Sequence, residues 1–253
     1  QMSDVWTSYD SKNFALEKIN LSIDRGTNYA IVGQSGSGKS TLLKLINGMM
    51  IPSKGTIKVD YVRPNMNDKK FKKMMHTIGY IPQSLGLIKN ITVIENILIG
   101  ALPRLSKIQS FLKKFPENEI QEAKKILKMV GLSEKENRKT YMLSGGEKRR
   151  VAIARALMQK PTILLADEIV SELDHVTARE IMDLIADAQK RMNLTAIMVH
   201  HDMQLALEYA NRVAVISKGE KILEIGVEGD NIVDFQTGDL TTEEIKEMYS
   251  NDS

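Results

Sequence analysis

The stretch Tyr29-Ala30-Ile31-Val32-Gly33-Gln34-Ser35-Gly36-Ser37-Gly38-Lys39-Ser40 decides the fold, because it joins an apolar strand to a glycine-rich loop and a helix. Two glycines bracket four residues and a Lys-Ser pair follows, which is the pattern of a phosphate-binding P-loop. Glycine lets the backbone curl so that its N–H groups point at phosphate oxygens, and the helix beginning near Lys39 adds its positive dipole end. A merely flexible loop is the alternative, but it does not explain why the strand, the Lys-Ser pair and the helix follow one another in the order that a P-loop requires. The stretch therefore predicts a site for a nucleoside triphosphate.

The polar residues of this loop have expected roles. Lys39 should reach the β- and γ-phosphates, and the Ser40 hydroxyl should bind Mg²⁺. The residues that we expect to contact the nucleotide are Gly33, Ser35, Gly36, Ser37, Gly38, Lys39, Ser40 and Thr41.

Two adjacent carboxylates, Asp167 and Glu168, follow the short apolar run 162–166. Such a run is typical of a strand buried on both faces, and open α/β sheets bind ligands at the carboxyl ends of their strands. Asp167 is expected to hold Mg²⁺ through water, and Glu168 to polarise the attacking water as a general base. A solvated turn is the alternative for the pair alone, and the P-loop upstream favours the catalytic interpretation.

The composition narrows the class of protein. The 253 residues are 42% hydrophobic and 26% charged, which is ordinary for a folded protein with a buried core. Cysteine is absent, which excludes a disulfide framework, and the net charge of +3 is only weak support for nucleic-acid binding. No apolar run approaches the roughly 20 residues that span a bilayer, and the first residues show no signal peptide. We expect a cytoplasmic protein that binds no nucleic acid and reaches a membrane only through partners.

Strand-like and helix-like stretches alternate along the chain, which predicts a largely parallel α/β sheet. The expected strands are residues 19–24, 28–32, 55–60, 77–81, 162–166 and 195–199. The expected core helices are residues 39–47 and 174–192. A terminal helix is expected at 241–249, capped by Thr241 or Thr242.

The segment 91–158 differs from this core because it lacks a convincing strand. Its residues 119–130 place apolar side chains on one helical face, so we expect a helical subdomain inserted into the core. The whole chain is predicted to be one domain, made of a core of residues 1–90 and 159–226, the helical subdomain 91–158 and a C-terminal tail 227–253.

Leu143-Ser144-Gly145-Gly146-Glu147 resembles the signature motif of the ATP-binding-cassette (ABC) ATPases, and the resemblance extends from about Val5 to Gly226. Other positions match features of the family in order and spacing. Tyr9 matches the aromatic that stacks on adenine, and Gln83 matches the Q-loop glutamine. Residues 171–174 match the D-loop, and His201 matches the switch histidine. Trp6 competes with Tyr9 for the adenine. The resemblance implies an α/β fold with a P-loop NTPase (RecA-like) core, an inserted helical subdomain and an N-terminal β subdomain.

The resemblance also implies that a second copy of the chain completes the site. In the family, the residues matching Ser144, Gly145 and Gly146 donate to a γ-phosphate that the opposite subunit's P-loop holds. Two ATP molecules then lie between two head-to-tail subunits of a homodimer. A helix N-terminus with small residues suits this role, because it attracts anions.

Further residues receive roles from the resemblance alone. Gln83 would bind the metal, sense the attacking water and link the core to the helical subdomain. His201 would contact the γ-phosphate and keep the catalytic glutamate aligned, unless the adjacent His200 takes that role. Asp174 would help join the two nucleotide sites across the dimer.

Three functions are compatible with these motifs: the ATPase subunit of a membrane transporter, a DNA-repair or chromosome ATPase, and a translation factor. The second class carries long coiled-coil arms between P-loop and signature, and the interval from Gly33 to Ser144 leaves no room for them. The third normally carries two cassettes in one chain. A transporter ATPase is therefore favoured, peripheral on the inner face of the cell membrane, with separate permease subunits and, for an importer, an external substrate-binding protein.

Two surfaces have alternative interpretations. The apolar residues after Gln83 either line a groove for a permease helix or belong to the core; they are Leu85, Leu87, Ile88, Ile91 and Ile94. The basic run 148–150 is expected to be a solvated helix face rather than a nucleic-acid site.

Several segments resemble the ATPase subunit of phosphonate importers, namely 87–105, 111–116 and 205–213, with 91–100 especially similar. This implies import of a phosphonate or a related oxyanion. Three features depart from the usual pattern: Ile169 stands where a proline usually follows the glutamate, Glu172 is unusual in the D-loop, and 147–149 replaces a Gln-rich run. The alternative is an ATPase of the lipoprotein-release or peptide-efflux type.

Overall fold

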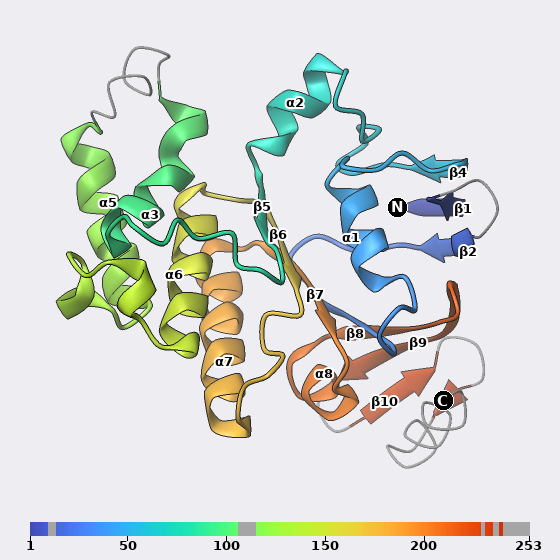
Figure 1. The fold of residues 1–253 in the computed structure, drawn as a ribbon. Coiled ribbons are helices and arrows are strands. Elements are labelled where there is room, and N and C mark those ends of the chain that lie inside the picture. Colours follow the sequence, from blue (N-terminus) through green and yellow to red (C-terminus); the bar gives the residue numbers. More distant parts are fainter. Residues whose placement is uncertain (10–13, 106–114, 229–230, 235–237, 240–253) are drawn as a thin grey trace. The chain divides into compact units, whose positions relative to one another are not determined.

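The computed structural model describes residues 1–9, 14–105, 115–228, 231–234 and 238–239 (Figure 1). Its backbone contacts divide the chain into two compact units, Gln1–Met75 with Thr195–Ser253, and His76–Leu194. The predicted helix at 241–249, with its Thr241 or Thr242 cap, lies outside the described residues, as do residues 111–114. Within the described chain, no helix has both the length and the apolar character needed to cross a bilayer.

The first unit contains a three-stranded antiparallel sheet in the order β2-β1-β4, formed by β1 (Met2–Ser8), β2 (Phe14–Leu21) and β4 (Lys54–Ile57). Trp6 of β1 packs edge-on against Phe14 of β2, with ring centroids 5.2 Å apart. The strand expected at 55–60 is thus shorter and belongs to this sheet. The sheet is the N-terminal β subdomain that the family resemblance implied.

A second set of strands in this unit surrounds β3 (Asn28–Val32). It pairs in parallel with β7 (Thr195–His200) on one side and β8 (Arg212–Ser217) on the other. All five residues of β3 are buried, as expected for an apolar strand in a parallel sheet. The prediction of a parallel sheet is confirmed for these three strands. Beyond β8 the sheet continues with the antiparallel strands β9 (Glu220–Glu228), β10 (Asn231–Asp234) and β11 (Gly238–Asp239).

The described residues of the first unit also form three helices: α1 (Lys39–Ile46), α2 (Lys69–Met75) and α8 (Met203–Tyr209). An apolar core cluster joins Met203 and Ala206 of α8 to Ala30 of β3 and Val213 of β8. Figure 1 shows α8 against these strands. The packing fixes the strand from which the P-loop emerges.

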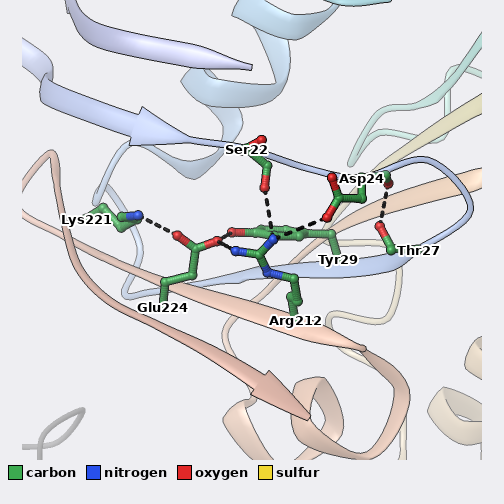
Figure 2. Close-up of polar contacts among 7 residues, drawn as sticks. All are labelled: Ser22, Asp24, Thr27, Tyr29, Arg212, Lys221 and Glu224. Carbon is green, nitrogen blue, oxygen red and sulfur yellow. Dashed lines mark hydrogen bonds and ion pairs between the residues drawn. The ribbon is translucent and has the colours of Figure 1, made fainter. Parts of the chain in front are cut away.

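A buried polar network also ties β3 to β8 and β9 (Figure 2). The Tyr29 hydroxyl donates to Glu224 Oε1 at 2.7 Å, and Arg212 Nη2 donates to the same oxygen at 2.7 Å. Lys221 donates to the other carboxylate oxygen, at 2.5 Å. Arg212 Nη1 also forms an ion pair with Asp24 Oδ2, at 3.6 Å. The single carboxylate of Glu224 therefore receives three donors from three strand positions.

The second unit contains the parallel pair β5 (Ile78–Ile81) and β6 (Ile163–Asp167) together with its helices. These are α3 (Val93–Leu98), η1 (Ile99–Arg104), α5 (Glu117–Met129), η2 (Ser133–Lys135), η3 (Thr140–Met142), α6 (Gly145–Met158) and α7 (His175–Met192). Helix α6 packs against α3, α5 and α7, and Figure 1 shows it beside α7. The described part of 91–158 forms helices and no strand, as the sequence predicted.

Candidate functional site

The P-loop connects β3 to α1 in the first unit, and its glycines are required by its geometry. A Cβ on Gly33 would lie 2.1 Å from the Ile216 carbonyl oxygen. A Cβ on Gly38 would lie 2.6 Å from the Ala15 carbonyl oxygen, and Gly38 has a φ of +106°. Gly36 has a φ of +84° in open space. Side chains at 33 and 38 would therefore push the loop away from its supporting backbone.

The Lys39 side chain is held by the loop itself. Its ammonium donates to the carbonyl oxygens of Gly33 and Gln34, each at 2.7 Å, and the residue is only 4% exposed. The Ser37 hydroxyl is buried without a hydrogen-bond partner among the described residues. A buried donor is costly to leave unpaired, and a phosphate oxygen would satisfy it. The loop therefore fits a bound phosphate chain.

The remaining residues predicted near the P-loop are placed as follows. Ser35 is exposed in the loop, Ser40 is partly exposed in the first turn of α1, and Thr41 is buried. The Tyr9 hydroxyl is 2.8 Å from Thr41 Oγ1, which brings its 63% exposed ring to α1. Its competitor Trp6 is instead packed on Phe14. The geometry favours Tyr9 as the aromatic available to a base.

The two adjacent histidines at the end of β7 differ completely in their surroundings. His200 is the last residue of the strand and is 1% exposed, and no residue in the described part of the chain hydrogen-bonds to either of its ring nitrogens. Burial lowers the pKa of His200 to about 4, although the Asp202 carboxylate opposes the shift. His201 is exposed, directly before Asp202, which caps α8. His201 is therefore the accessible one of the two.

Asp167 and Glu168 lie in the second unit, at the carboxyl end of the β5–β6 pair. Asp167 is the last residue of β6 and is 5% exposed. Tyr80 of β5 hydrogen-bonds to its carboxylate, and burial together with this carboxylate raises the pKa of Tyr80 to about 12. Gln83 Nε2 donates to Glu168 Oε2 at 3.0 Å. The structure thus brings together Gln83 and Glu168, which are 85 positions apart in the sequence.

The signature motif forms the start of α6. Ser144 is its N-cap: its hydroxyl accepts from Glu147 N, and Glu147 Oε2 accepts from Ser144 N at 2.8 Å. Lys135 forms an ion pair with Glu147, and its hydrogen bond is the main reason why the pKa of Glu147 lies below its usual range. Gly145 is exposed and Gly146 is partly exposed. The motif therefore presents a capped helix N-terminus, which suits an anion.

Asp174, the D-loop carboxylate, caps α7. It accepts from Thr177 N at 2.9 Å and from Thr177 Oγ1 at 2.6 Å. The bond from the Thr177 hydroxyl is the main reason why the pKa of Asp174 is lowered. The carboxylate is therefore fixed and charged at the end of the D-loop.

Two expectations about side chains beside this site are changed by the structure. The solvated-face interpretation of 148–150 is wrong for Arg149 and Arg150, whose guanidinium groups bond to other parts of the same unit. None of the five apolar residues that were predicted either to line a groove or to join the core is fully buried. Leu85, Leu87, Ile91 and Ile94 are partly exposed, and Ile88 is 50% exposed. A surface role for these five therefore remains a prediction.

The sequence reasoning missed Tyr80 and Arg149 as neighbours of Asp167 and Glu168. Tyr80 stands on the strand before Gln83, and strand alternation places it on the sheet beside Asp167. Arg149 bonds to carbonyl oxygens around Glu168, which no local pattern reveals.

Comparison with known proteins agrees with this arrangement. The profile of the family described as "ABC transporter" matches residues 16–171. The methionine import ATP-binding protein MetN 2 of Listeria monocytogenes is 40% identical over 223 residues, which are 87% of this chain and 63% of that protein. The phosphonates import ATP-binding protein PhnC 2 of Haloarcula marismortui is 39% identical over 214 residues, which are 84% of this chain and 79% of that protein. The chain thus spans less than two thirds of the length of the methionine import relative.

Solved structures show the same fold. The ATP-binding cassette MJ0796, described as a dimer in a post-hydrolysis state bound to ADP and Pi, has a TM-score of 0.79 and 31% identity, covering 90% of this chain and 98% of that one. The cbiO1 protein from Clostridium perfringens, part of the ABC transporter complex cbiONQ, has a TM-score of 0.78 and 33% identity, covering 88% of this chain and 86% of that one. These matches, with the P-loop, signature and carboxylates in order, show that the chain belongs to the ABC transporter family and has the fold of its ATP-binding cassette ATPases.

Proposed function

We propose that this chain binds and hydrolyses ATP as the nucleotide-binding subunit of an ABC transporter. The observation that carries the proposal is the Lys39 ammonium, held by two carbonyl oxygens inside a loop in which Gly33 and Gly38 leave no room for a side chain. A buried cation beside an unpaired Ser37 hydroxyl is suited to a polyphosphate and to few other ligands. Tyr9, tethered to Thr41, would stack on the adenine.

We propose, from the resemblance to the family, that Mg²⁺ and an attacking water accompany the bound nucleotide. Ser40, Gln83 and Asp167 supply the hydroxyl, amide and carboxylate oxygens that Mg²⁺ prefers, and Asp167 would act through water. The metal would neutralise charge on the β- and γ-phosphates. Glu168 would accept the proton of the attacking water, with its carboxylate oriented by the Gln83 amide. His201 would contact the γ-phosphate from the end of β7.

We propose that two copies of the chain act together. Ser144, Gly145 and Gly146 of one copy would donate to the γ-phosphate held by the other, with Asp174 linking the two sites. The dimeric state described for MJ0796 with ADP and Pi supports this arrangement. ATP would favour the closed dimer, and loss of the γ-phosphate would favour the open one, because the two states differ in their affinity for ATP and ADP. The isolated chain is then a weak ATPase until it dimerises.

We propose that the dimer drives separate permease subunits and is held by them at the inner face of the membrane. Because MetN 2 and PhnC 2 are import ATP-binding proteins, import is favoured over export. The cbiO1 protein is part of a transporter complex, which supports the expectation of partner subunits. Two cargo classes are supported. The segments that resemble phosphonate importers, together with the similarity to PhnC 2, support a phosphonate or a related oxyanion as the transported substrate. The similarity to MetN 2 supports methionine as the substrate. For either cargo, an external binding protein would deliver it to the permease.

The test uses Glu168→Gln, which keeps the size of the side chain and removes the base. We expect nucleotide binding to persist, turnover to fall by about a hundredfold or more, and ATP to convert the variant to a dimer in size-exclusion chromatography. The control is Glu220→Gln, which removes an exposed carboxylate of β9. Wild-type turnover by Glu168→Gln would refute the role of Glu168. A fully active monomer would refute the two-copy site.

A further inference from the structure

Helix α6 carries an arginine that bonds to the backbone around Glu168. Arg149 Nε donates to the carbonyl oxygen of Ile169 at 2.6 Å, and its Nη2 donates to that of Ser171 at 2.5 Å. Ile169 directly follows Glu168, and the Glu168 carbonyl oxygen in turn accepts the Ser171 hydroxyl at 2.8 Å. The guanidinium therefore bridges two carbonyls of the loop that presents the proposed base.

A second arginine of α6 makes the same kind of contact with the loop after Gln83. Arg155 Nη2 donates to the Leu85 carbonyl oxygen at 2.7 Å, and Nη1 donates to that of Gly86 at 2.6 Å. Both residues have positive φ, of 61° and 58°. The contact therefore holds a turn that is not a relaxed backbone shape for leucine.

The two loops that α6 holds are the two that meet at the site. Gln83 precedes the turn held by Arg155, Glu168 precedes the carbonyls held by Arg149, and the Gln83 amide bonds to the Glu168 carboxylate. An arginine fork can fix two carbonyl oxygens at once, because its planar donors point in set directions. Partial burial of the guanidinium groups lowers the pKa of both arginines, because it disfavours their charged form.

We infer that Arg149 and Arg155 are positioning residues that set the contact between Gln83 and Glu168 from the signature helix. The inference rests on the proposed role of Glu168 as the base. Because α6 begins at the signature glycines, a movement of that helix when the signature meets a phosphate would be transmitted to the base of the same subunit. The two arginines would thus couple the signature end of α6 to hydrolysis at Glu168.

The departures from the family pattern lie around the same contact. Arg149 belongs to the unusual run 147–149, and one of its two acceptors is the carbonyl of the unusual Ile169. The carboxylate of the unusual Glu172 favours the charged form of Arg149. Residues that look unrelated in the sequence therefore belong to one set of contacts.

The matched control is Arg150, the neighbour of Arg149 on α6. It donates to the Val130 carbonyl oxygen and to Glu180, so it ties α6 to other helices and not to the two loops. We compare Arg149→Gln, Arg155→Gln and Arg150→Gln in the full chain. All three remove one guanidinium from the same helix, so a general loss of packing affects all of them.

Hydrogen exchange measures the positioning without turnover. The Ser171 amide bonds to the Glu168 carbonyl, and the Leu85 amide to the Pro82 carbonyl, so both report on the order of their loops. Arg149→Gln should accelerate exchange in the peptide containing Ser171 by about tenfold or more, and Arg155→Gln should do so in the peptide containing Leu85. Arg150→Gln should leave both peptides protected.

Steady-state ATP hydrolysis then measures the consequence for the reaction. We expect kcat to fall roughly 10- to 100-fold in Arg149→Gln and Arg155→Gln with KM for ATP within about twofold, because the base is displaced while nucleotide binding is retained. Arg150→Gln should keep its kcat. Unchanged exchange, faster exchange with unchanged kcat, or equal effects in Arg150→Gln would each overturn the inference. Full turnover by Glu168→Gln would refute the proposed role of Glu168 as the base. The exchange experiment would still test whether the two arginines hold their loops.

Discussion

The buried ring of His200 makes the stability of the first unit depend on pH. Its pKa of about 4 in the folded protein compares with about 6.5 for an ordinary histidine in the unfolded chain. Between these two pH values His200 is protonated in the unfolded chain and neutral in the folded chain. The contribution of His200 to the free energy of unfolding is therefore fully present above pH 6.5 and is lost as the pH falls toward 4. The difference corresponds to about 3 kcal/mol of the free energy of unfolding.

The assay is urea denaturation of wild type and His200→Leu at pH 4 to 7, followed by fluorescence. Trp6 is the single tryptophan of the chain and lies in the same unit as His200, so its emission reports on the unit in question. Carboxylates also titrate in this range, but they do so in both proteins, and the difference between the two curves isolates His200. We expect the variant to gain about 3 kcal/mol relative to wild type between pH 7 and 4.

The control is His76→Leu, which removes an exposed histidine from the other unit. Its curve should run parallel to that of wild type. The reasoning is refuted if the curve of His200→Leu also runs parallel to wild type, because the ring would then charge in the folded state without cost.

Other perturbations test the P-loop, the adenine contact and the polar network. Lys39→Ala should weaken ATP binding by about a hundredfold, since a buried cation facing phosphates is lost; calorimetric titration showing unchanged affinity would count against the loop as the phosphate site. Tyr9→Ala should lower ATP affinity by about tenfold and Trp6→Ala by less than threefold, and the reverse order would reassign the adenine contact. Glu224→Gln should cost about 3 kcal/mol of the free energy of unfolding, because two cations lose their carboxylate, and Tyr29→Phe about 1.5 kcal/mol; equal losses in urea denaturation would contradict this account.

Local sequence patterns were enough to predict the elements that carry the site. The mainly apolar runs of β3 and β6 have the strand character expected of buried parallel strands, and the glycines of 33–40 fix the loop between strand and helix. The cap of α7 by Asp174 is also a local effect, because a carboxylate bonds to an amide three residues on, although this cap was not among the predictions. These features depend on neighbours in the chain and so can be read from it.

Features that depend on distant partners were not predicted. Strands β9 to β11 follow the parallel strands but run antiparallel, and nothing in the local sequence of β9 marks Glu224 as the acceptor for Tyr29 and Arg212. The same limit applies to Arg149, whose acceptors are carbonyl oxygens 20 and 22 positions away. Every residue has a carbonyl oxygen, so no residue type marks such a partner in the sequence.

The backbone at Glu168 explains why this loop requires support from another helix. Glu168 and Glu172 both have positive φ, of 47° and 63°, a conformation that costs a side-chain-bearing residue about 1 kcal/mol or more. Two such residues within one short loop cost roughly 2 kcal/mol. Each bond from a charged guanidinium to a carbonyl contributes about 1.5–3 kcal/mol, so the two bonds from Arg149 are sufficient to hold the strained form. The position of the proposed base is therefore set by α6 as much as by the strand that precedes it.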